Sequence, residues 1–510
     1  MPHVFLNHAT RRTAWVFSVA MLVGGYVLLV PSVSVLPSLN AYNEQRALQV
    51  GVLIASGAAL LMSKEARREW LSVLSETPRL ARWGLGAVLG LGIASSALAP
   101  APFYALLEVG HFSLLFLVAG GVAAAARRAP KQTKRFLLGS VAISVLLYTV
   151  YFAASYFAAT ALPAFDVGRE TITGFGNVRF FNQYQTWTLP LLAGAAIALP
   201  KGQWAFKGTV LTLTSFWWAL VLASNVRGTV VAMAIAAAGA WLLFRDRSYR
   251  WLGVQAMALL LGGALYYFLF TSGGGLFTSG GGATPQVVER LGEVGPRSGR
   301  LQHWTKCLGM ALADPWLGAG PMHYAWPPND FAKAAHPHNA FFQWLSEWGI
   351  PSTALMSGLV VWGGWSWIRR EMRGTLEDTT ETNGVRVALV ASLLAGTAHA
   401  MVSGIIVMPV SQMLLVLVGG WAWGRHCGGR GSGNSNPELF SFRAQAALCV
   451  LIAASTGAVG ASLHDLRAAE ERREAFEEAV DRNRFSPRYW TQGYLQVRDP
   501  SVMSQVSEED

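Results

Sequence analysis

A series of long apolar stretches is the feature that most limits how this chain can fold. A helix needs about 20 predominantly apolar residues to cross ~30 Å of hydrocarbon, and the sequence offers about thirteen such stretches. Only 14% of the residues are charged, whereas soluble proteins carry roughly a quarter. We therefore predict an all-α, polytopic transmembrane helix bundle of about 12–13 spans. The stretches are residues 13–31, 47–63, 83–99, 102–125, 136–160, 184–200, 208–224, 228–244, 251–271, 350–368, 385–407, 410–424 and 443–461.

Basic residues concentrate in alternate short loops, which is the pattern that orients membrane proteins with positive charge on the cytoplasmic side. We therefore interpret the formal net charge of +11 as an orientation signal, and we predict no nucleic-acid partner. The basic loops are 64–82, 127–135, 201–207, 245–250 and 369–373. The opposite side would receive residues 161–183, the turn Ser224–Gly228, the polar loop 272–349 between spans 9 and 10, and the C-terminal tail.

The chain divides into four segments on this topology. Residues 1–160 form N-terminal transmembrane helices, the first of which is interpreted as a retained span and not as a cleaved signal peptide. Residues 161–425 form a membrane core that includes the outer loop 272–349. Residues 426–461 form an inner loop and the last span. Residues 462–510 form a short polar outer tail, with an amphipathic helix that stops before Pro487.

Several arginines fall on the outer side, where orientation does not explain them. Arg46, Arg169 and Arg290 each have a carboxylate within three residues, so we interpret them as locally balanced loop charges. Arg179, Arg227, Arg297 and Arg300 have none so close. Arg227 lies in a turn of a few residues between two apolar helices, and an ionisable group so close to hydrocarbon is a candidate functional residue. The alternatives are snorkelling to the interface for Arg227 and solvated loop charges for Arg297 and Arg300.

The sequence His336-Pro337-His338-Asn339 is the second concentration of polar chemistry. Pro337 favours helix initiation, and the predicted helix would place His338, Phe342, Leu345 and Gly349 on one face. The partial positive charge of a helix N-terminus and nearby arginines would both disfavour an imidazolium ion at His338. A neutral imidazole can act as a general base. The alternative is a histidine that caps the helix or packs locally.

Together these residues indicate one kind of chemistry. Arginines bind phosphate-rich leaving groups through bidentate contacts, and a neutral histidine can activate a hydroxyl nucleophile. The carboxylates of the loop are dispersed apart from Glu289 and Glu293, so we predict no hard-cation site. Cys307, Cys427 and Cys449 fall in different compartments, so we predict no disulfide and no cysteine-based metal site. No cofactor and no metal are expected.

Five motifs carry a resemblance to a known family. The sequence resembles the O-antigen ligase and O-antigen polymerase superfamily of bacterial membrane glycosyltransferases over about residues 165–425, and its His338 and Gly349 are similar to the family's His followed after ten residues by Gly. The motifs are GNVRFFNQYQTWTLPLL (Gly176–Leu192), SNVRG (Ser224–Gly228), RSGRLQHW (Arg297–Trp304), DPWLGAGP (Asp314–Pro321) and HPHNAFFQWLSEWGIP (His336–Pro351).

The resemblance implies a metal-independent, inverting transfer of a glycan from undecaprenyl pyrophosphate to an acceptor hydroxyl at the periplasmic face of the bacterial inner membrane. Residues 161–425 would be the catalytic core and His338 the base, with His336 as its rival. Gly318 and Gly320 are predicted turn residues, and His303 and His323 structural ones. The implied pyrophosphate ligands are Arg179, Arg227 and Arg300 with Arg297, and the implied substrate contacts are Asn182, Gln183, Gln185, His336 and Asn339. The alternative for the Asn182–Gln185 cluster is a set of interfacial polar residues.

The acceptor stays open at the level of the superfamily. It would be lipid A-core in a ligase, another lipid-linked glycan in an O-antigen or exopolysaccharide polymerase, or an exported protein such as a pilin in a protein O-oligosaccharyltransferase. The cluster at Asn182–Gln185 loosely resembles the protein transferases, and the outer tail could recruit a protein; we nevertheless favour the ligase. A lipid-linked oligosaccharide transporter is an alternative of another class, although the paired broken helices of transporters are not evident. Membrane lipids are partners in every case.

Overall fold

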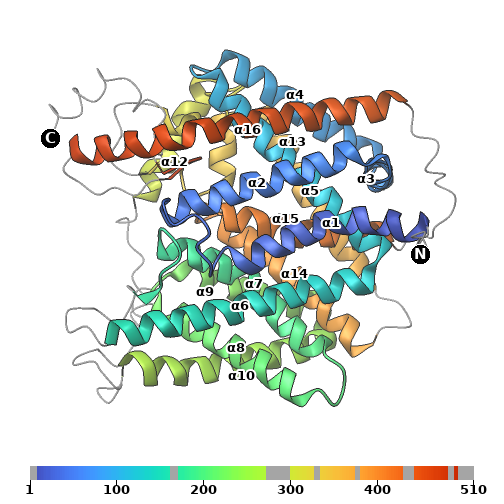
Figure 1. Ribbon diagram of the computed structural model, residues 1–510, viewed down its shortest axis with the longest axis vertical. Helices are drawn as coiled ribbons and strands as arrows, with labels where there is room; N and C mark the ends of the chain where they lie inside the picture. The colour runs from blue at the N-terminus through green and yellow to red at the C-terminus, as the bar shows by residue number, and fades with distance from the viewer. Residues whose placement is uncertain are drawn as a thin grey trace, which may run out of the picture.

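The computed structural model describes residues 8–160, 171–271, 299–326, 334–373, 379–428, 442–479 and 487–491. These residues form a bundle of long helices that run side by side (Figure 1). No strand occurs among them. The predicted all-α helix bundle is therefore confirmed.

The long helices coincide with the apolar stretches of the sequence. Seven helical stretches of the described chain are long and apolar enough, by length and composition, to cross a membrane, and one of them combines two consecutive helices, α9 and α10. The protein is thus a multi-pass membrane protein, and the count of 12–13 spans stays a prediction. The long helices are α1 (His8–Leu29), α2 (Ala41–Met62), α4 (Arg79–Leu98), α5 (Pro102–Arg128), α6 (Pro130–Thr160), α7 (Val178–Ala198), α8 (Trp204–Ala223), α9 (Arg227–Phe244), α10 (Tyr249–Tyr266), α13 (Ala340–Arg373), α14 (Thr380–Ala400), α15 (Pro409–Gly428) and α16 (Phe442–Ala479).

Shorter helices cap the two ends of the bundle. The helix α3 (Lys64–Glu76) lies at one end with the 3₁₀ helix η2 (Arg245–Ser248). The helix α12 (Arg300–Ala313) lies at the other end, to the left in Figure 1, beside α13. Two further short segments are η3 (Tyr267–Thr271), a π-helical turn that ends α10, and η5 (His323–Ala325).

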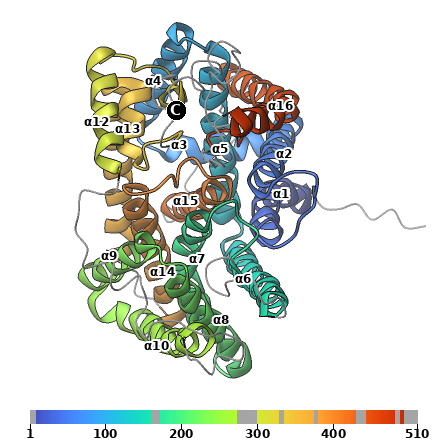
Figure 2. The ribbon, with the colours of Figure 1, turned by 90° about the vertical axis from the view of Figure 1, so that its left-hand side faces the viewer.

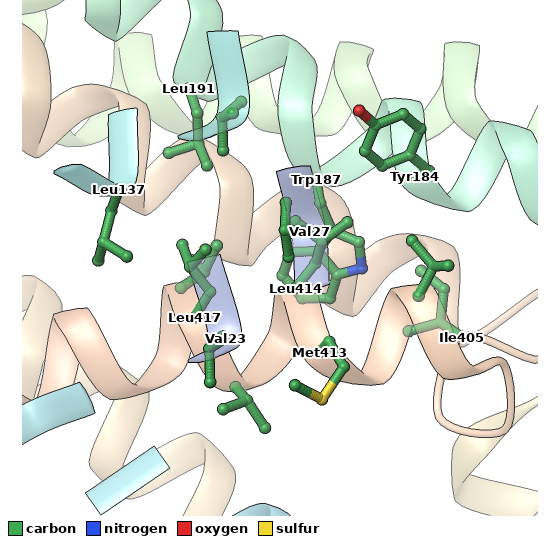
Figure 3. Close-up of a cluster of buried hydrophobic side chains, with 14 of the residues drawn as sticks. Val23, Val27, Leu137, Tyr184, Trp187, Leu191, Ile405, Met413, Leu414 and Leu417 are labelled. Carbon is green, nitrogen blue, oxygen red and sulfur yellow. The ribbon is translucent and has the colours of Figure 1, made fainter. Parts of the chain in front are cut away.

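Helix α7 forms the centre of the core, and nearly all its residues from Val178 to Ala196 are buried. Its Trp187 and Leu191 face Leu414 and Leu417 of α15 in Figure 3. The indole N–H of Trp187 donates to Ser411 Oγ at 2.9 Å. Without a large hydrophobic difference between lipid and protein, such close packing is what holds membrane helices together. The core therefore fixes α7, whose N-terminal turn reaches the end of the bundle that the sequence predicts to be the outer one.

The basic loops meet at the end of the bundle that carries α3. Arg127 at the end of α5 pairs with Glu76 at the end of α3 at 2.6 Å. Arg425 near the end of α15 pairs with Glu371 near the end of α13 at 2.8 Å, and Arg247 of η2 donates to Met372 O at 3.1 Å. These contacts, with the shared surroundings of Glu76 and Arg369, bring the basic loops 64–82, 127–135, 245–250 and 369–373 to one end, whereas the placement of loop 201–207 there stays a prediction.

The last helix differs from the prediction. The last span and the predicted tail helix form one continuous helix, α16, of 38 residues, so the tail is helical up to Ala479 but has no helix of its own. The apolar and polar halves join without a break because no proline interrupts residues 442–479. After α16, the described segment Pro487–Thr491 is buried against the bundle.

Candidate arginine and histidine site

Three predicted arginines come together from the N-termini of three helices. Arg179 lies in the first turn of α7, whose Asn177 side chain accepts the Arg179 backbone N–H at 2.9 Å. Arg227 is the first residue of α9 and Arg300 the first of α12. Arg300 is half-buried, and its pKa is lowered by burial and by the charges of Arg179 and Arg227. Figure 2 looks onto this end of the bundle, where α12 lies beside α13, with α9 and α7 nearby.

His338 faces these arginines from a loop, not from a helix. Helix α13 begins at Ala340, because the Asn339 side chain accepts the Phe342 backbone N–H at 3.0 Å and so caps it. His338 itself has φ 54°, in the left-handed region that non-glycine residues rarely adopt. The predicted helical face from His338 to Gly349 is therefore wrong. Strain of this kind concentrates at functional positions.

The surroundings of His338 keep its imidazole neutral. Burial first, and then the charges of Arg179, His303 and Arg300, lower its pKa to about 3. The His336 ring packs against it with centroids 4.3 Å apart, and the His303 ring lies at 6.0 Å. A neutral imidazole can accept a proton at physiological pH. The expectation of a neutral His338 therefore agrees with its surroundings, with burial as the largest cause.

His336, the rival base, is packed more tightly. It is buried, and a Cβ at Gly404 would lie 2.7 Å from its Cε1 atom. Its Nδ1 accepts the backbone N–H of His338 at 3.3 Å, so this bond helps to fix the strained His338 backbone. The pKa of His336 is lowered by burial and then by His338 and Arg488. This geometry favours a positioning role for His336.

The polar cluster of α7 lies inside the bundle below Arg179. Asn182 donates to Ser224 Oγ at 3.0 Å, and Gln183 donates to Ser403 Oγ at 2.8 Å. Gln185 is bonded at both ends of its amide, accepting from Asn182 at 2.6 Å and donating to Trp217 O at 2.9 Å. The side-chain oxygens of Asn182 and Gln183 have no hydrogen-bond partner within the described chain. Two of the three amides thus keep an acceptor for a ligand, whereas Gln185 joins α7 to α8.

Asn339 is occupied by the fold. Besides capping α13, it donates through Nδ2 to Met401 O at 2.8 Å, which ties the His338 loop to the end of α14. A substrate contact through this side chain would have to replace one of these bonds. The structure therefore places Asn339 behind the site, as a residue that holds His338.

Two histidines join the site that the sequence did not assign to it. His303 follows Arg300 by three residues and so shares its face of α12; its Nδ1 is hydrogen bonded to the Tyr324 hydroxyl at 2.6 Å. His399 of α14 is hydrogen bonded to Thr186 Oγ1 at 2.8 Å. The spacing from Arg300 could have revealed His303, and an ionisable residue within an apolar stretch could have revealed His399.

The segment Asp314–Pro321 packs against the start of α13, as a turn-rich bridge. Gly318 and Gly320 have φ 71° and 106°, which confirms them as turn residues. Ala319 and Gly320 donate backbone N–H groups to the carbonyls of Ser346 and Glu347 at 2.9 and 3.1 Å. Gly349 marks a kink in α13 with φ 77°, and a Cβ there would lie 2.6 Å from Trp316 O. The kink at Gly349 therefore lies where the segment Asp314–Pro321 crosses α13. This crossing gives a structural reason for the spacing between His338 and Gly349 in the sequence.

His323 is structural, as predicted. Its Nε2 accepts the Ala101 backbone N–H at 3.0 Å, and its Nδ1 is bonded to Pro321 O at 2.8 Å. Both ring nitrogens are thus used to join the bridge to the start of α5.

A buried ion network lies directly behind the His338 loop. Arg488 of the tail segment Pro487–Thr491 donates to both oxygens of Glu108 at 2.9 Å and to Glu347 Oε2 at 2.6 Å. Glu347 Oε1 also accepts the Tyr324 backbone N–H at 3.0 Å. Burial raises the pKa of Glu347, and Arg488 opposes that rise. The network ties the tail to α5 and to α13 on the far side of the His338 loop.

Arg46 corrects one expectation about loop charges. It is buried, and its guanidinium donates to Gln412 Oε1 at 2.7 Å and to Tyr489 O at 3.1 Å. Glu44 instead accepts the Leu36 backbone N–H at 2.7 Å. The local balance of Arg46 by Glu44 is therefore wrong, since adjacency along the chain does not determine which way two helix side chains point. Arg169, Arg290 and Arg297 lie outside the described residues.

The fold is that of a multi-pass membrane protein, and the family that its sequence matches consists of membrane glycosyltransferase-like enzymes. The sequence model of the O-antigen ligase family matches residues 210–357, a segment that contains Arg227, Arg300 and His338. This match supports a relationship of the segment to the O-antigen ligase superfamily. No curated protein matches it.

Proposed function

We propose that the protein is a metal-independent, inverting glycosyltransferase that moves a glycan from undecaprenyl pyrophosphate to an acceptor hydroxyl at the periplasmic face of the inner membrane. The observation that carries this proposal is the meeting of Arg179, Arg227 and Arg300 near His338, a partly buried histidine whose pKa is lowered. Clustered cations are suited to binding an anion, and a neutral imidazole beside them is suited to accepting a proton. The pyrophosphate of the glycan donor supplies the anion, and the hydroxyl of the acceptor supplies the proton.

The proposed reaction uses one proton transfer and one displacement. His338 takes the proton of the acceptor hydroxyl, and the hydroxyl oxygen attacks the anomeric carbon of the donor. The bond from that carbon to the pyrophosphate oxygen breaks as the new glycosidic bond forms, which inverts the configuration. The leaving group departs as lipid pyrophosphate, and His338 releases its proton to solvent.

The arginines would bind the pyrophosphate, with Arg297 as a fourth ligand. Preorganised cations that meet developing charge lower a barrier most when they need no rearrangement. Their places on the first turns of three helices support this role, because helix N-termini add favourable partial charge. The acceptor oxygens of Asn182 and Gln183, which have no hydrogen-bond partner within the described chain, and the ring of His336 would contact the substrate.

Among acceptors, we propose lipid A-core, which makes the protein an O-antigen ligase. A glycan acceptor, as in a polymerase, and an exported protein, as in a protein O-oligosaccharyltransferase, are the alternatives. Purified protein offered each acceptor in turn with the same lipid-linked donor would separate them by product. Transport of the donor across vesicles without any glycosidic product would instead favour a transporter.

Arg227→Ala tests the proposal most directly. We expect transfer by the purified, reconstituted protein to fall roughly 10²–10³-fold, since one donor to developing charge is worth that much. Arg467→Ala is the matched control, because Arg467 is 93% exposed on α16 and pairs with the exposed Glu471. Excess chelator should leave the wild-type rate unchanged. Full activity of Arg227→Ala, or loss of activity with chelator, contradicts the proposal.

The pH dependence of transfer tests the neutral state of His338. A histidine with a lowered pKa is deprotonated above that pKa, so activity should be present above about pH 3 and lost only as pH falls through it. We expect kcat/KM of the wild-type protein, which reports the free enzyme, to stay flat between about pH 5 and 7. Arg179→Gln removes a nearby positive charge and should move the acid limb upward. If kcat/KM of the wild type instead falls with an apparent pKa near the ordinary histidine value of about 6.5, a neutral base with a lowered pKa at His338 is ruled out.

A further inference from the structure

A cavity of about 660 Å³ lies at the end of the bundle opposite the His338 loop. Its walls come from α4, α5 and α15 and from the second half of α13, and its rim includes Glu76 at the end of α3. Roughly 35 Å of helix, at about 1.5 Å per residue, separates Gly349 from Arg373 along α13. The cavity is therefore distinct from the arginine and histidine site.

The walls of the cavity suit hydrocarbon. Leu85 of α4, Phe116 of α5 and Leu359 of α13 line it, and Trp423 of α15 stacks on Phe116 with ring centroids 5.5 Å apart. Trp362 lines the cavity too, although 47% of its surface is exposed. An apolar recess between spans is filled by acyl chains when it opens onto a bilayer, because nothing else at that depth is apolar.

The rim of the cavity has an excess of positive charge. Arg369, Arg370 and Arg373 line it from the last two turns of α13. Of the carboxylates nearby, Glu76 is already paired with Arg127 at 2.6 Å. Glu371 is paired with both Arg425 and Arg386, at 2.8 and 3.0 Å. Within the described residues, the arginines of the rim are thus not neutralised by these acids.

A buried hydrogen-bond donor also lines the cavity. Trp367 is only 5% exposed, and its indole N–H has no acceptor in the described part of the chain. The hydroxyl of Thr77, at the rim, likewise has no partner there. Buried polar groups are nearly always hydrogen bonded, so these two groups indicate a ligand with oxygen acceptors at this depth.

From these observations we propose that the cavity binds an anionic phospholipid, with its phosphate at Arg369 and Arg373, an ester oxygen at Trp367 and its acyl chains along the Phe116–Trp423 wall. Basic pockets between spans at the cytoplasmic surface bind such headgroups, and in the predicted orientation this is the cytoplasmic end. Charge complementarity distinguishes this occupant from the far end of a polyprenyl chain, which carries no phosphate to meet Arg369 and Arg373.

The test is native mass spectrometry of the full-length protein with added phosphatidylglycerol or phosphatidylcholine of identical acyl chains. We expect the wild type to retain phosphatidylglycerol preferentially, and Arg369→Gln with Arg373→Gln to weaken that binding roughly tenfold to thirtyfold, as the loss of two cations near a lipid surface implies. Arg245→Gln is the matched control. Arg245 lies over the Trp241 ring at 4.8 Å as Arg369 lies over Trp365 at 5.3 Å, but it does not line the cavity.

Trp367→Phe provides a second variant that keeps an aromatic ring and removes the N–H donor. We expect it to weaken phosphatidylglycerol binding by a few fold while the melting temperature measured without lipid stays unchanged. Equal retention of the two lipids by the wild type would overturn the proposal. So would an equal loss in Arg245→Gln, or retention of phosphatidylglycerol by the Arg369→Gln, Arg373→Gln variant that equals that of the wild type. Transfer activity plays no part in this test, so its result is independent of the proposed function.

Discussion

Replacing His338 with alanine should lower the rate of glycan transfer roughly 10²–10⁴-fold, the usual contribution of a general base. The protein should still accumulate in the membrane, because the loop is held by Asn339 and not by the His338 side chain: Asn339 caps α13 and donates to Met401 O at 2.8 Å. The measurement is the initial rate of product formation by purified protein with a lipid-linked donor. Binding of the donor should change far less than the rate, since the arginines remain.

Three comparisons make this result specific. His464→Ala changes an exposed histidine on α16 and should leave the rate unchanged. Added imidazole should partly restore transfer by His338→Ala if the lost group is a base, but not if the loop has merely collapsed. A larger loss in His336→Ala, together with imidazole rescue of that variant alone, would move the base to His336.

Replacing Arg488 with methionine should have the largest effect on stability. The change leaves Glu108 and Glu347 buried without the guanidinium that contacts both, and breaking a buried pair in this way costs about 3–5 kcal/mol. We expect a clear fall in the melting temperature of the detergent-purified protein. Because Glu347 lies on α13 beyond the His338 loop, transfer should also decrease at temperatures at which the variant is still folded.

The control for Arg488 is Arg467→Met, which removes an ion pair whose partners are 93% and 66% exposed. Exposed pairs contribute little, so its melting temperature should match the wild type. The triple change Arg488→Met, Glu108→Gln and Glu347→Gln removes all three charges and should recover much of the loss. If Arg488→Met melts like Arg467→Met, the buried network does not stabilise the tail.

The positions of the helices could be predicted from the sequence because a lipid environment imposes a simple requirement. Every span must be apolar and must satisfy its backbone hydrogen bonds internally, so each apolar stretch becomes a helix. The side on which each helix ends is then predicted from the charge of the loops. Arg179, Arg227 and Arg300 all fall on the same side, so this topology brings them to one end of the bundle. The continuous helix α16 was missed because its polarity changes halfway, whereas its backbone does not.

The details of the site could not be predicted in the same way. The left-handed backbone of His338 depends on contacts with His336 and Asn339 that a repeating helical pattern cannot represent. Glu347 and Arg488 are 141 residues apart in the sequence, and each resembles an ordinary solvated charge in its own neighbourhood. Only the folded chain shows that the tail returns to the bundle.

The burial of Pro487–Thr491 has a consequence for how the protein is made. This segment leaves the ribosome after every described transmembrane helix, yet its Arg488 neutralises carboxylates on α5 and α13 that are inserted much earlier. Until the tail docks, Glu108 and Glu347 lack their cation. Docking of the tail is therefore the step that completes assembly, and a nascent chain holds its loop of histidines only after its last described residues have arrived.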